Sequence, residues 1–524
     1  MTIPRLKQAR PVAVRRRWLS VLLVASSTQL CLASVSHAAT KTPDITDRGI
    51  TSAVESGLRL DKGVSPVGVD VSTSQGIVTL SGTVHNLLAK ERGLKIAESI
   101  RGVLGVIDRT IVTPVSLSDE DIRKTILWAL LEDPATESYQ IGVSVKSAVA
   151  TLTGTAGSHA ERQLADRIAK GVKGVKEVRN EVTISYFGKR TDPEIAADVK
   201  ARFQWDIWLN GDALSAAVKD GKVTVSGVIG SAIGKARAAD DAWVSGVVSV
   251  DEKAVKVDPR ARHDARHQFK YVVKSDSDIK QAVQAALRLD PRVMAFAPDV
   301  TVEGGGVILG GSVGNLEAKT AAEQDAHNIV GVWRVDNLLN VRPKGSFVDS
   351  EMEKKMKTAL MWDPMLDGST IDVAVINRVA YLSGAVDTRF ESVEAEDVAS
   401  RLKGVLLVRN HLKVEPDDVF IYDDLPFFSF DNWPYYRRSP YYISQTQGPE
   451  PYLSDAQIKK DIESSFFWSP FVDRDAITLA VHGGVATLTG TVGNWIGWRE
   501  ADKDARKSAG DVLNRLTIKK GAWW

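Results

Sequence analysis

A strand-like segment that ends in the same glycine step occurs six times along this chain. The copies are VTLSGTV at 78–84, ATLTGTA at 150–156, VTVSGVI at 223–229, VILGGSV at 307–313, AYLSGAV at 380–386 and ATLTGTV at 486–492. Recurrence at a nearly constant separation means that one small supersecondary unit has been copied in tandem. The fold must therefore be predicted one copy at a time.

One glycine holds the same place in every copy. These repeat glycines are Gly82, Gly154, Gly227, Gly311, Gly384 and Gly490. A glycine inside a strand marks a bulge or a place where another part of the backbone comes close. We expect these six residues to have a structural role.

Each copy begins with a segment of helical periodicity. In the second copy Ile122, Ile126 and Leu130 fall on one face of a 3.6-residue helix. We expect Asp192 to be an N-cap residue followed by a proline at the first helical position, and Ser350 with Glu353 to form a capping box. Asp-Pro steps at 133–134, 290–291 and 363–364 predict the helix ends, since the residue before proline avoids the helical region.

Two alternating strands, a second helix and a last strand complete each copy. Period-two alternation, as in 141–145 and 371–375, predicts a sheet with one buried face. Asn180, Asn337 and Asn410 recur near the last strand, where we expect a turn with a left-handed backbone. The predicted order is α-β-β-α-β, so the fold class is α+β, a tandem array of small two-layer sandwiches.

The succession of helix, Asp-Pro stop, G-x-V-x-L-x-G-x-V strand, helix and G-V-x-x-V-x-N-x-L-x-V strand resembles the BON domain of bacterial osmotic-shock and nodulation-related envelope proteins. The likeness covers six BON-like domains at 44–113, 118–184, 192–257, 276–341, 349–414 and 454–518. A basic linker at 258–275 and an aromatic, proline-rich insert at 415–453 separate them. The resemblance implies binding to phospholipid or other envelope surfaces and brings no catalytic residues with it.

The N-terminus reads as a secretory signal peptide over residues 1–38. Three arginines at 15–17 precede a short apolar run, and Ser36-His37-Ala38 forms a small-x-small end, so we expect cleavage after Ala38. This segment holds six of the 67 lysines and arginines, the one cysteine and none of the 66 acidic residues. The mature chain would thus be mildly acidic and free of thiols, which argues against bulk nucleic-acid binding and cysteine chemistry.

The sequence contains no convincing metal-binding, phosphate-binding or catalytic motif. His263 and His267 have a helical metal-like spacing, but they lie in a basic segment without a third ligand, so we expect no metal site and no cofactor. The glycines at 304–306 lack the lysine of a phosphate loop and occupy the hairpin place of their repeat. We therefore expect a protein that is not an enzyme.

The aromatic insert does not fit the repeat, and it holds six of the ten tyrosines. Its candidate contact residues for a membrane or a partner are Trp433, Tyr435, Tyr436, Arg437, Arg438, Tyr441 and Tyr442. Aromatic rings beside cations suit the headgroup level of a membrane or a protein interface. The alternative is that the insert folds back and fills a groove on a neighbouring domain.

The sequence thus predicts a noncatalytic periplasmic protein, peripherally attached to a membrane, that binds phospholipid or cell-wall surfaces at many places and has a role in envelope stress. Several weak sites on one chain would give avidity. The alternative is a protein-interaction scaffold for a periplasmic or outer-membrane assembly.

Overall fold

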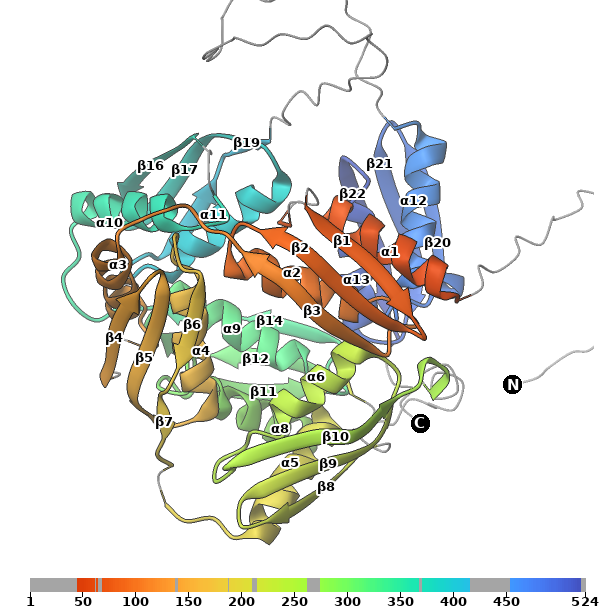
Figure 1. Ribbon diagram of the computed structural model, residues 1–524, viewed down its shortest axis with the longest axis horizontal. Helices are drawn as coiled ribbons and strands as arrows, with labels where there is room; N and C mark the ends of the chain where they lie inside the picture. Colours follow the sequence, from red (N-terminus) through yellow and green to blue (C-terminus); the bar gives the residue numbers. More distant parts are fainter. Residues whose placement is uncertain are drawn as a thin grey trace, which may run out of the picture. The chain divides into compact units, whose positions relative to one another are not determined.

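A computed structural model describes residues 45–519 apart from 62, 65–67, 137–139, 187, 210–213, 262–273, 367–369 and 415–452 (Figure 1). Six copies of one α-β-β-α-β unit follow one another in this part of the chain, and we number them as the first to the sixth domain. All six belong to one compact unit. The predicted element order and α+β class are confirmed.

Every domain begins with a 14-residue helix. The first helices are α1 (Asp47–Leu60), α3 (Asp119–Glu132), α5 (Asp192–Trp205), α8 (Asp276–Leu289), α10 (Asp349–Trp362) and α12 (Asp455–Trp468). The second helices are α2 (Leu87–Glu98), α4 (His159–Lys170), α6 (Ala232–Asp241), α9 (Leu316–His327), α11 (Arg389–Arg401) and α13 (Trp495–Arg506).

A β-hairpin lies between the two helices, and a last strand follows the second helix. The hairpins are β1 (Val69–Ser74) with β2 (Ile77–Val84), β4 (Gln140–Lys146) with β5 (Val149–Ala156), β8 (Leu214–Lys219) with β9 (Lys222–Ile229), β11 (Asp299–Glu303) with β12 (Gly306–Gly310), β16 (Thr370–Ile376) with β17 (Val379–Val386), and β20 (Ile477–His482) with β21 (Val485–Val492). The last strands are β3 (Gly105–Val112), β6 (Glu177–Asn180) with β7 (Thr183–Ile184), β10 (Ser249–Val257), β14 (Arg334–Asn337) with β15 (Asn340–Val341), β18 (Leu407–Asn410) with β19 (Lys413–Val414), and β22 (Asp511–Ile518).

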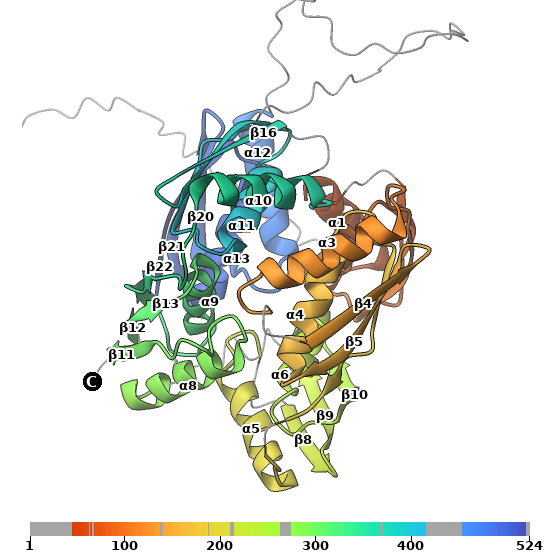
Figure 2. The same cartoon turned by 90° about the vertical axis from the view of Figure 1, so that its left-hand side faces the viewer.

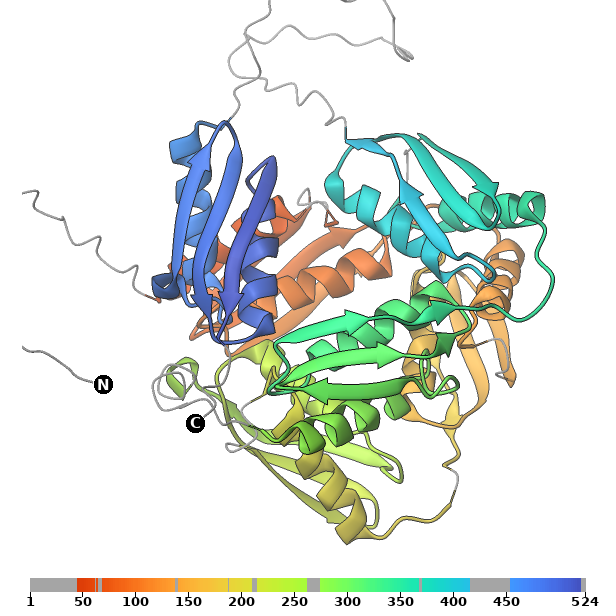
Figure 3. The same ribbon diagram turned by 180° about the vertical axis from the view of Figure 1, so that it is seen from behind.

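The glycine-step strand is the middle strand of each sheet. In the first domain β2 pairs antiparallel with β1 and parallel with β3, and the other domains repeat this pattern. The parallel pair requires a crossover connection, which the second helix provides. Both helices lie on one face of the sheet, as α3 and α4 do beside β4 and β5 (Figure 2). Figure 3 presents the sheets of the fourth (green) and sixth (blue) domains from the side away from their helices.

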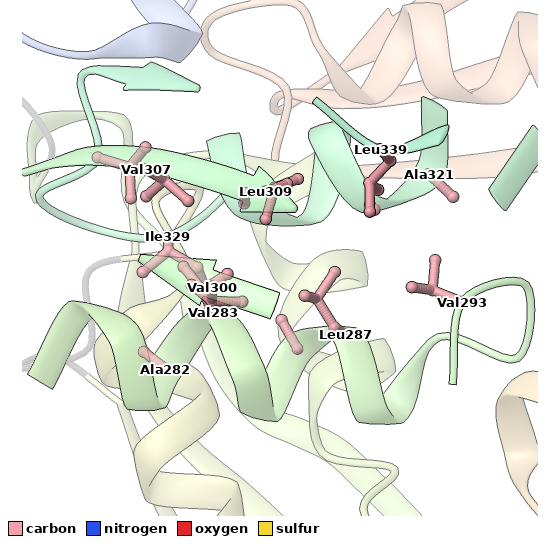
Figure 4. Packing of buried hydrophobic residues seen from close by; sticks show 14 of the residues in the cluster. Ala282, Val283, Leu287, Val293, Val300, Val307, Leu309, Ala321, Ile329 and Leu339 are labelled. Atoms are coloured by element: carbon pink, nitrogen blue, oxygen red, sulfur yellow. The ribbon is translucent and has the colours of Figure 1, made fainter. Parts of the chain in front are cut away.

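Each domain has its own hydrophobic core between the helices and the sheet. In the fourth domain Val283 and Leu287 of α8 meet Leu309 of β12 inside this layer (Figure 4). All three side chains are at most 3% exposed. Alternation along β12 places Val307 and Leu309 on the same inner face. The periodic residues of the sequence therefore build six small cores of the same kind.

The first helical residue of every domain is an aspartate that braces the hairpin turn. Each carboxylate accepts two main-chain hydrogen bonds of 2.7–3.0 Å from turn residues 28 and 29 positions later. The aspartates are Asp47, Asp119, Asp192, Asp276, Asp349 and Asp455. The turn residues have positive φ even where they are not glycine, as at Ser147 and Ala148, so this bracing holds an unfavourable backbone in place.

Two predicted helix caps are wrong. In one of them the aspartate predicted as the cap is the first helical residue, which binds the hairpin turn instead. Thr191 is the N-cap of α5 and forms a capping box with Glu194, while Asp192 is one residue inside the helix. The N-cap of α10 is Val348 without a side-chain cap, so Ser350 forms no capping box. The predicted ends are confirmed, since the aspartates at 133, 290 and 363 are C-cap residues with extended backbones.

The predicted left-handed turn at the recurrent asparagines is also wrong. Asn180, Asn337 and Asn410 end strands with negative φ, and the side chain of each binds the second helix of its own domain. Nδ2 of Asn180, for example, donates to the carbonyl of Arg162 at 2.9 Å. The asparagine thus ties the last strand to the crossover helix.

Candidate functional site

The candidate contact residues of the aromatic insert, Trp433 to Tyr442, lie outside the described residues. His263 and His267 lie outside them as well. Within the part of the chain that the structure describes, no three His, Cys, Asp or Glu residues are grouped to hold a metal ion. No helix in that same part is long and apolar enough to cross a membrane.

The six repeat glycines all have positive φ, between 97° and 134°. At four of them a Cβ atom would lie 1.8–2.2 Å from a carbonyl oxygen at or just before the start of the paired hairpin strand: Gly82, Gly154, Gly384 and Gly490. Gly311 is less crowded, since its nearest neighbour would be 3.5 Å away. The glycine step therefore permits a close approach of two strands.

Main-chain hydrogen bonds join domains that are far apart in sequence. In three domains the first helix ends in a tryptophan whose carbonyl accepts from another domain. Val330 N donates to Trp205 O at 2.9 Å, Lys173 N to Trp362 O at 2.9 Å and Arg101 N to Trp468 O at 2.8 Å. These bonds link the third domain to the fourth, the second to the fifth and the first to the sixth. The sequence signal is a tryptophan at the fourteenth position of the helix, which our sequence analysis missed.

A pocket of about 350 Å³ lies between the third and fourth domains. Its walls are α5 and α8, and their apolar lining residues include Ala201, Trp205, Ala282, Ala285, Ala286 and Leu289. Two of the lining residues also take part in main-chain bonds between these domains: Ile207 N donates to Asn328 O at 2.9 Å and Val330 N donates to Trp205 O at 2.9 Å. Both bonds are main-chain contacts between the two domains whose helices line the pocket.

Charged groups line the pocket's inner part. Arg202 pairs with Asp241 at 2.7 Å and Arg237 with Asp206 at 2.7 Å. Asp206 is 5% exposed, and burial together with the neighbouring charge of Asp241 raises its pKa to about 7. Asp325 of α9 is another charged residue that lines the pocket. Its Oδ2 atom is buried without a hydrogen-bond partner.

Two histidines at domain boundaries stack on tryptophans of another domain. His159 lies 3.9 Å from Trp243, centroid to centroid, and His327 lies 3.8 Å from Trp495, with nearly parallel rings in both pairs. Each histidine is 7% exposed and has a buried Nδ1 without a partner. Burial is the main cause that lowers the pKa of each to about 4, so both rings are neutral at pH 7.

Comparison with known proteins identifies the repeated unit. The family model described as "BON domain" matches residues 46–114, 118–186, 191–259, 275–343, 348–416 and 454–520. The chain is similar to Osmotically-inducible protein Y of Escherichia coli, with 32% identity over 143 residues that cover 26% of this chain and 71% of the relative. It is also similar to Outer membrane lipoprotein DolP of Haemophilus influenzae, with 30% identity over 135 residues, or 25% of this chain and 69% of the relative.

A structural comparison finds CdsD, a structural protein of the type III secretion system of Chlamydia trachomatis. The match has a TM-score of 0.12 and 14% identity, and it covers 42% of this chain and 97% of the solved chain. At such a TM-score the likeness carries no argument about this chain.

Proposed function

Because this chain belongs to the BON domain family, with six copies of the domain, we propose that it is a noncatalytic protein of the periplasmic envelope. It binds phospholipid or cell-wall surfaces through several domains at once. The observation that carries this proposal is the sixfold repetition of one binding-type module over nearly the whole chain after the predicted signal peptide.

The two relatives support the compartment. One is named for induction by osmotic stress and the other as an outer-membrane lipoprotein. A chain with the predicted leader at 1–38 would reach the same compartment and act there in envelope stress.

Multivalency is the proposed mechanism. Once one domain holds the surface, the others meet it at a high effective concentration, so weak single sites add up to firm attachment. The aromatic insert is the proposed anchor, because tyrosine and tryptophan rings settle at the headgroup level and Arg437 and Arg438 attract anionic lipid.

Co-sedimentation of the mature chain with anionic liposomes tests this function. We expect the wild type to pellet with the liposomes and to do so less as salt rises, because ionic attraction is screened over about 8 Å at physiological ionic strength. Serine in place of Trp433, Tyr435, Tyr436, Tyr441 and Tyr442 should reduce pelleting and leave the melting temperature of the domains unchanged.

A matched control is Tyr381→Ser, which removes an exposed ring from the outer face of the fifth sheet. It should pellet like the wild type. If the insert variant melts earlier and still pellets like the wild type, the insert fills a groove and the membrane contact lies on the domains themselves. If the wild type pellets with neither liposomes nor isolated cell wall, the proposed function is wrong.

A second candidate function is a scaffold for a periplasmic assembly. The specific observation in its favour is that these domains already bind one another through helix ends, as Trp362 and Lys173 do. Cross-linking of the chain in the periplasm, followed by identification of the linked proteins, tests this alternative. Recovery of one partner in a fixed ratio, together with an absence of liposome binding, would favour it.

A further inference from the structure

The fourth domain leaves one enclosed carboxylate without a partner. Oδ2 of Asp325 is buried and accepts no hydrogen bond, and the residue lines the pocket between the third and fourth domains. A buried charged group without a partner is costly, so such a group is normally paired or bound by something else.

The nearby arginines are committed to other carboxylates. Arg202 binds Asp241 at 2.7 Å, Arg237 binds Asp206 at 2.7 Å, and Arg292 makes several bonds with Asp290, the shortest of 2.5 Å. Their positive charges are thus already matched one for one. Among the carboxylates that line the pocket, Asp325 is the one without an ion-pair partner in the described part of the chain.

In the sixth domain the aspartate at the position equivalent to Asp325 has an ion-pair partner. Asp325 and Asp504 both lie ten residues after the N-cap asparagine of the second helix, Asn315 or Asn494. In the sixth domain Lys507, three residues further on, places its ammonium 2.7 Å from Asp504. The residue of the fourth domain that corresponds to Lys507 is Asn328, which lines the pocket.

We propose that the pocket between the third and fourth domains binds a small organic ammonium ion, whose ammonium group lies beside Asp325 where the sixth domain has the ammonium of Lys507. The aliphatic part of the ligand lies against Trp205 and the alanines of α8. The volume of about 350 Å³ leaves room for a ligand of this kind.

The rim of the pocket adds a preference for a zwitterion. Arg288 of α8 lines the pocket, is exposed, and has no carboxylate partner among the described residues. Arg190, which also lines the pocket, pairs with Asp198 at 2.6 Å. Phosphate on the far end of an aminoalkyl ligand would therefore meet Arg288. The chemistry of an aminoalkyl phosphate occurs both in a free metabolite and in a lipid headgroup.

Protonation of Asp325 supports this assignment. Burial and, after it, the charge of Asp290 raise the pKa of Asp325 well above its ordinary value, in spite of Arg292. The raised pKa means that the free pocket favours the protonated carboxyl, whereas an ammonium ligand favours the ionised carboxylate. Binding should therefore release a proton and become tighter as the pH rises.

Isothermal titration calorimetry of the mature chain with phosphoethanolamine tests the proposal. We expect saturable binding at one site per chain, weaker binding of ethanolamine, and no binding of inorganic phosphate. Asp325→Asn should weaken binding at least tenfold. Asn328→Lys should abolish it and raise the melting temperature, because the tethered ammonium then fills the place of the ligand.

Two further variants keep the test independent of folding defects. Ala285→Leu narrows the pocket without changing a charge and should also abolish binding. Asp278→Asn, an exposed position of α8 outside the pocket lining, should keep the wild-type affinity for ethanolamine. Absence of binding to the wild type, or wild-type affinity in Asp325→Asn and Ala285→Leu, would overturn the proposal.

Vesicles separate the two sources of the ligand. If vesicles that contain phosphatidylethanolamine compete with free phosphoethanolamine for the wild type, the ligand is a headgroup; if they do not, it is the free zwitterion. The proposal does not rest on membrane attachment, since loss of the pocket in Ala285→Leu should leave pelleting with anionic liposomes unchanged.

Discussion

Oδ1 of Asp455, the first residue of α12, accepts a hydrogen bond of 2.9 Å from the backbone N–H of Gly484, 29 residues later. Gly483 donates to the other carboxylate oxygen at 2.9 Å, so one side chain closes the hairpin turn of the sixth domain. The same relationship recurs in the other five domains. It joins the first helix of each domain to the hairpin of the same domain.

This bond predicts acid sensitivity of the sixth domain. The two N–H donors lower the pKa of Asp455, so the folded state favours the ionised carboxylate. The stabilisation is present above the ordinary pKa of 3.8 and is lost as the pH falls through the lower folded value. Asp455→Asn should lower the urea midpoint at neutral pH and flatten its decline in acid. Asp475→Asn, with a side chain that is 89% exposed, is the control and should change neither.

Alanine at a repeat glycine should destabilise the domain that contains it. A Cβ at Gly82 would lie 1.8 Å from the carbonyl oxygen of Gly68, and φ is +108°. We expect a loss of about 1–3 kcal/mol in the free energy of unfolding. Gly105→Ala, in the same domain, meets its nearest atom at an ordinary 3.5 Å and should cost much less. Equal losses in the two variants would contradict the close approach of the strands. Chemical denaturation followed by hydrogen exchange would show whether the loss stays in the first domain.

Acid should weaken the contact between the second and third domains. The pKa of His159 is lowered to about 4, so the unfolded chain takes up a proton between pH 6.5 and about 4 that the folded chain does not. Stability should therefore fall across this window, by on the order of 3 kcal/mol for one such histidine, and level off below it. His159→Phe keeps the stack on Trp243 without the titration. Its melting temperature should depend less on pH than that of the wild type, and an identical pH profile would refute this origin.

Alkaline pH should also destabilise the protein, through Glu317 of the fourth domain. Burial and the charge of Asp133 raise the pKa of Glu317 to about 8, although Arg401 and Arg292 oppose the shift. The folded state then keeps a proton that the unfolded state releases near its ordinary pKa of 4.5, so stability is lost as the pH rises towards 8. Glu317→Gln mimics the protonated form and should melt higher than the wild type at pH 9. Glu303→Gln, on an exposed strand end, serves as the control.

The sequence alone determined the repeated fold, because its signals are local. Helical periodicity, period-two strands and the Asp-Pro stops act within a few residues, and six copies of each reinforce the interpretation. Local signals gave a wrong prediction where the hydrogen-bond partner of a residue is distant in sequence. The prediction that Asp192 is a cap is wrong because the carboxylate binds Asp220 and Gly221 of the hairpin turn, 28 and 29 residues later.

The tertiary structure decided which domains pair and where the pocket lies. A helix-terminal carbonyl such as that of Trp205 accepts a bond from any well-placed N–H, so no side chain in the sequence encodes Val330 as its donor. Asp325 and Asp504 are likewise equivalent in their repeats, and only the spatial surroundings separate a carboxylate bound by Lys507 from one that faces a pocket. Pairing between elements far apart in the chain depends on how whole surfaces fit together, which a repeat pattern does not specify.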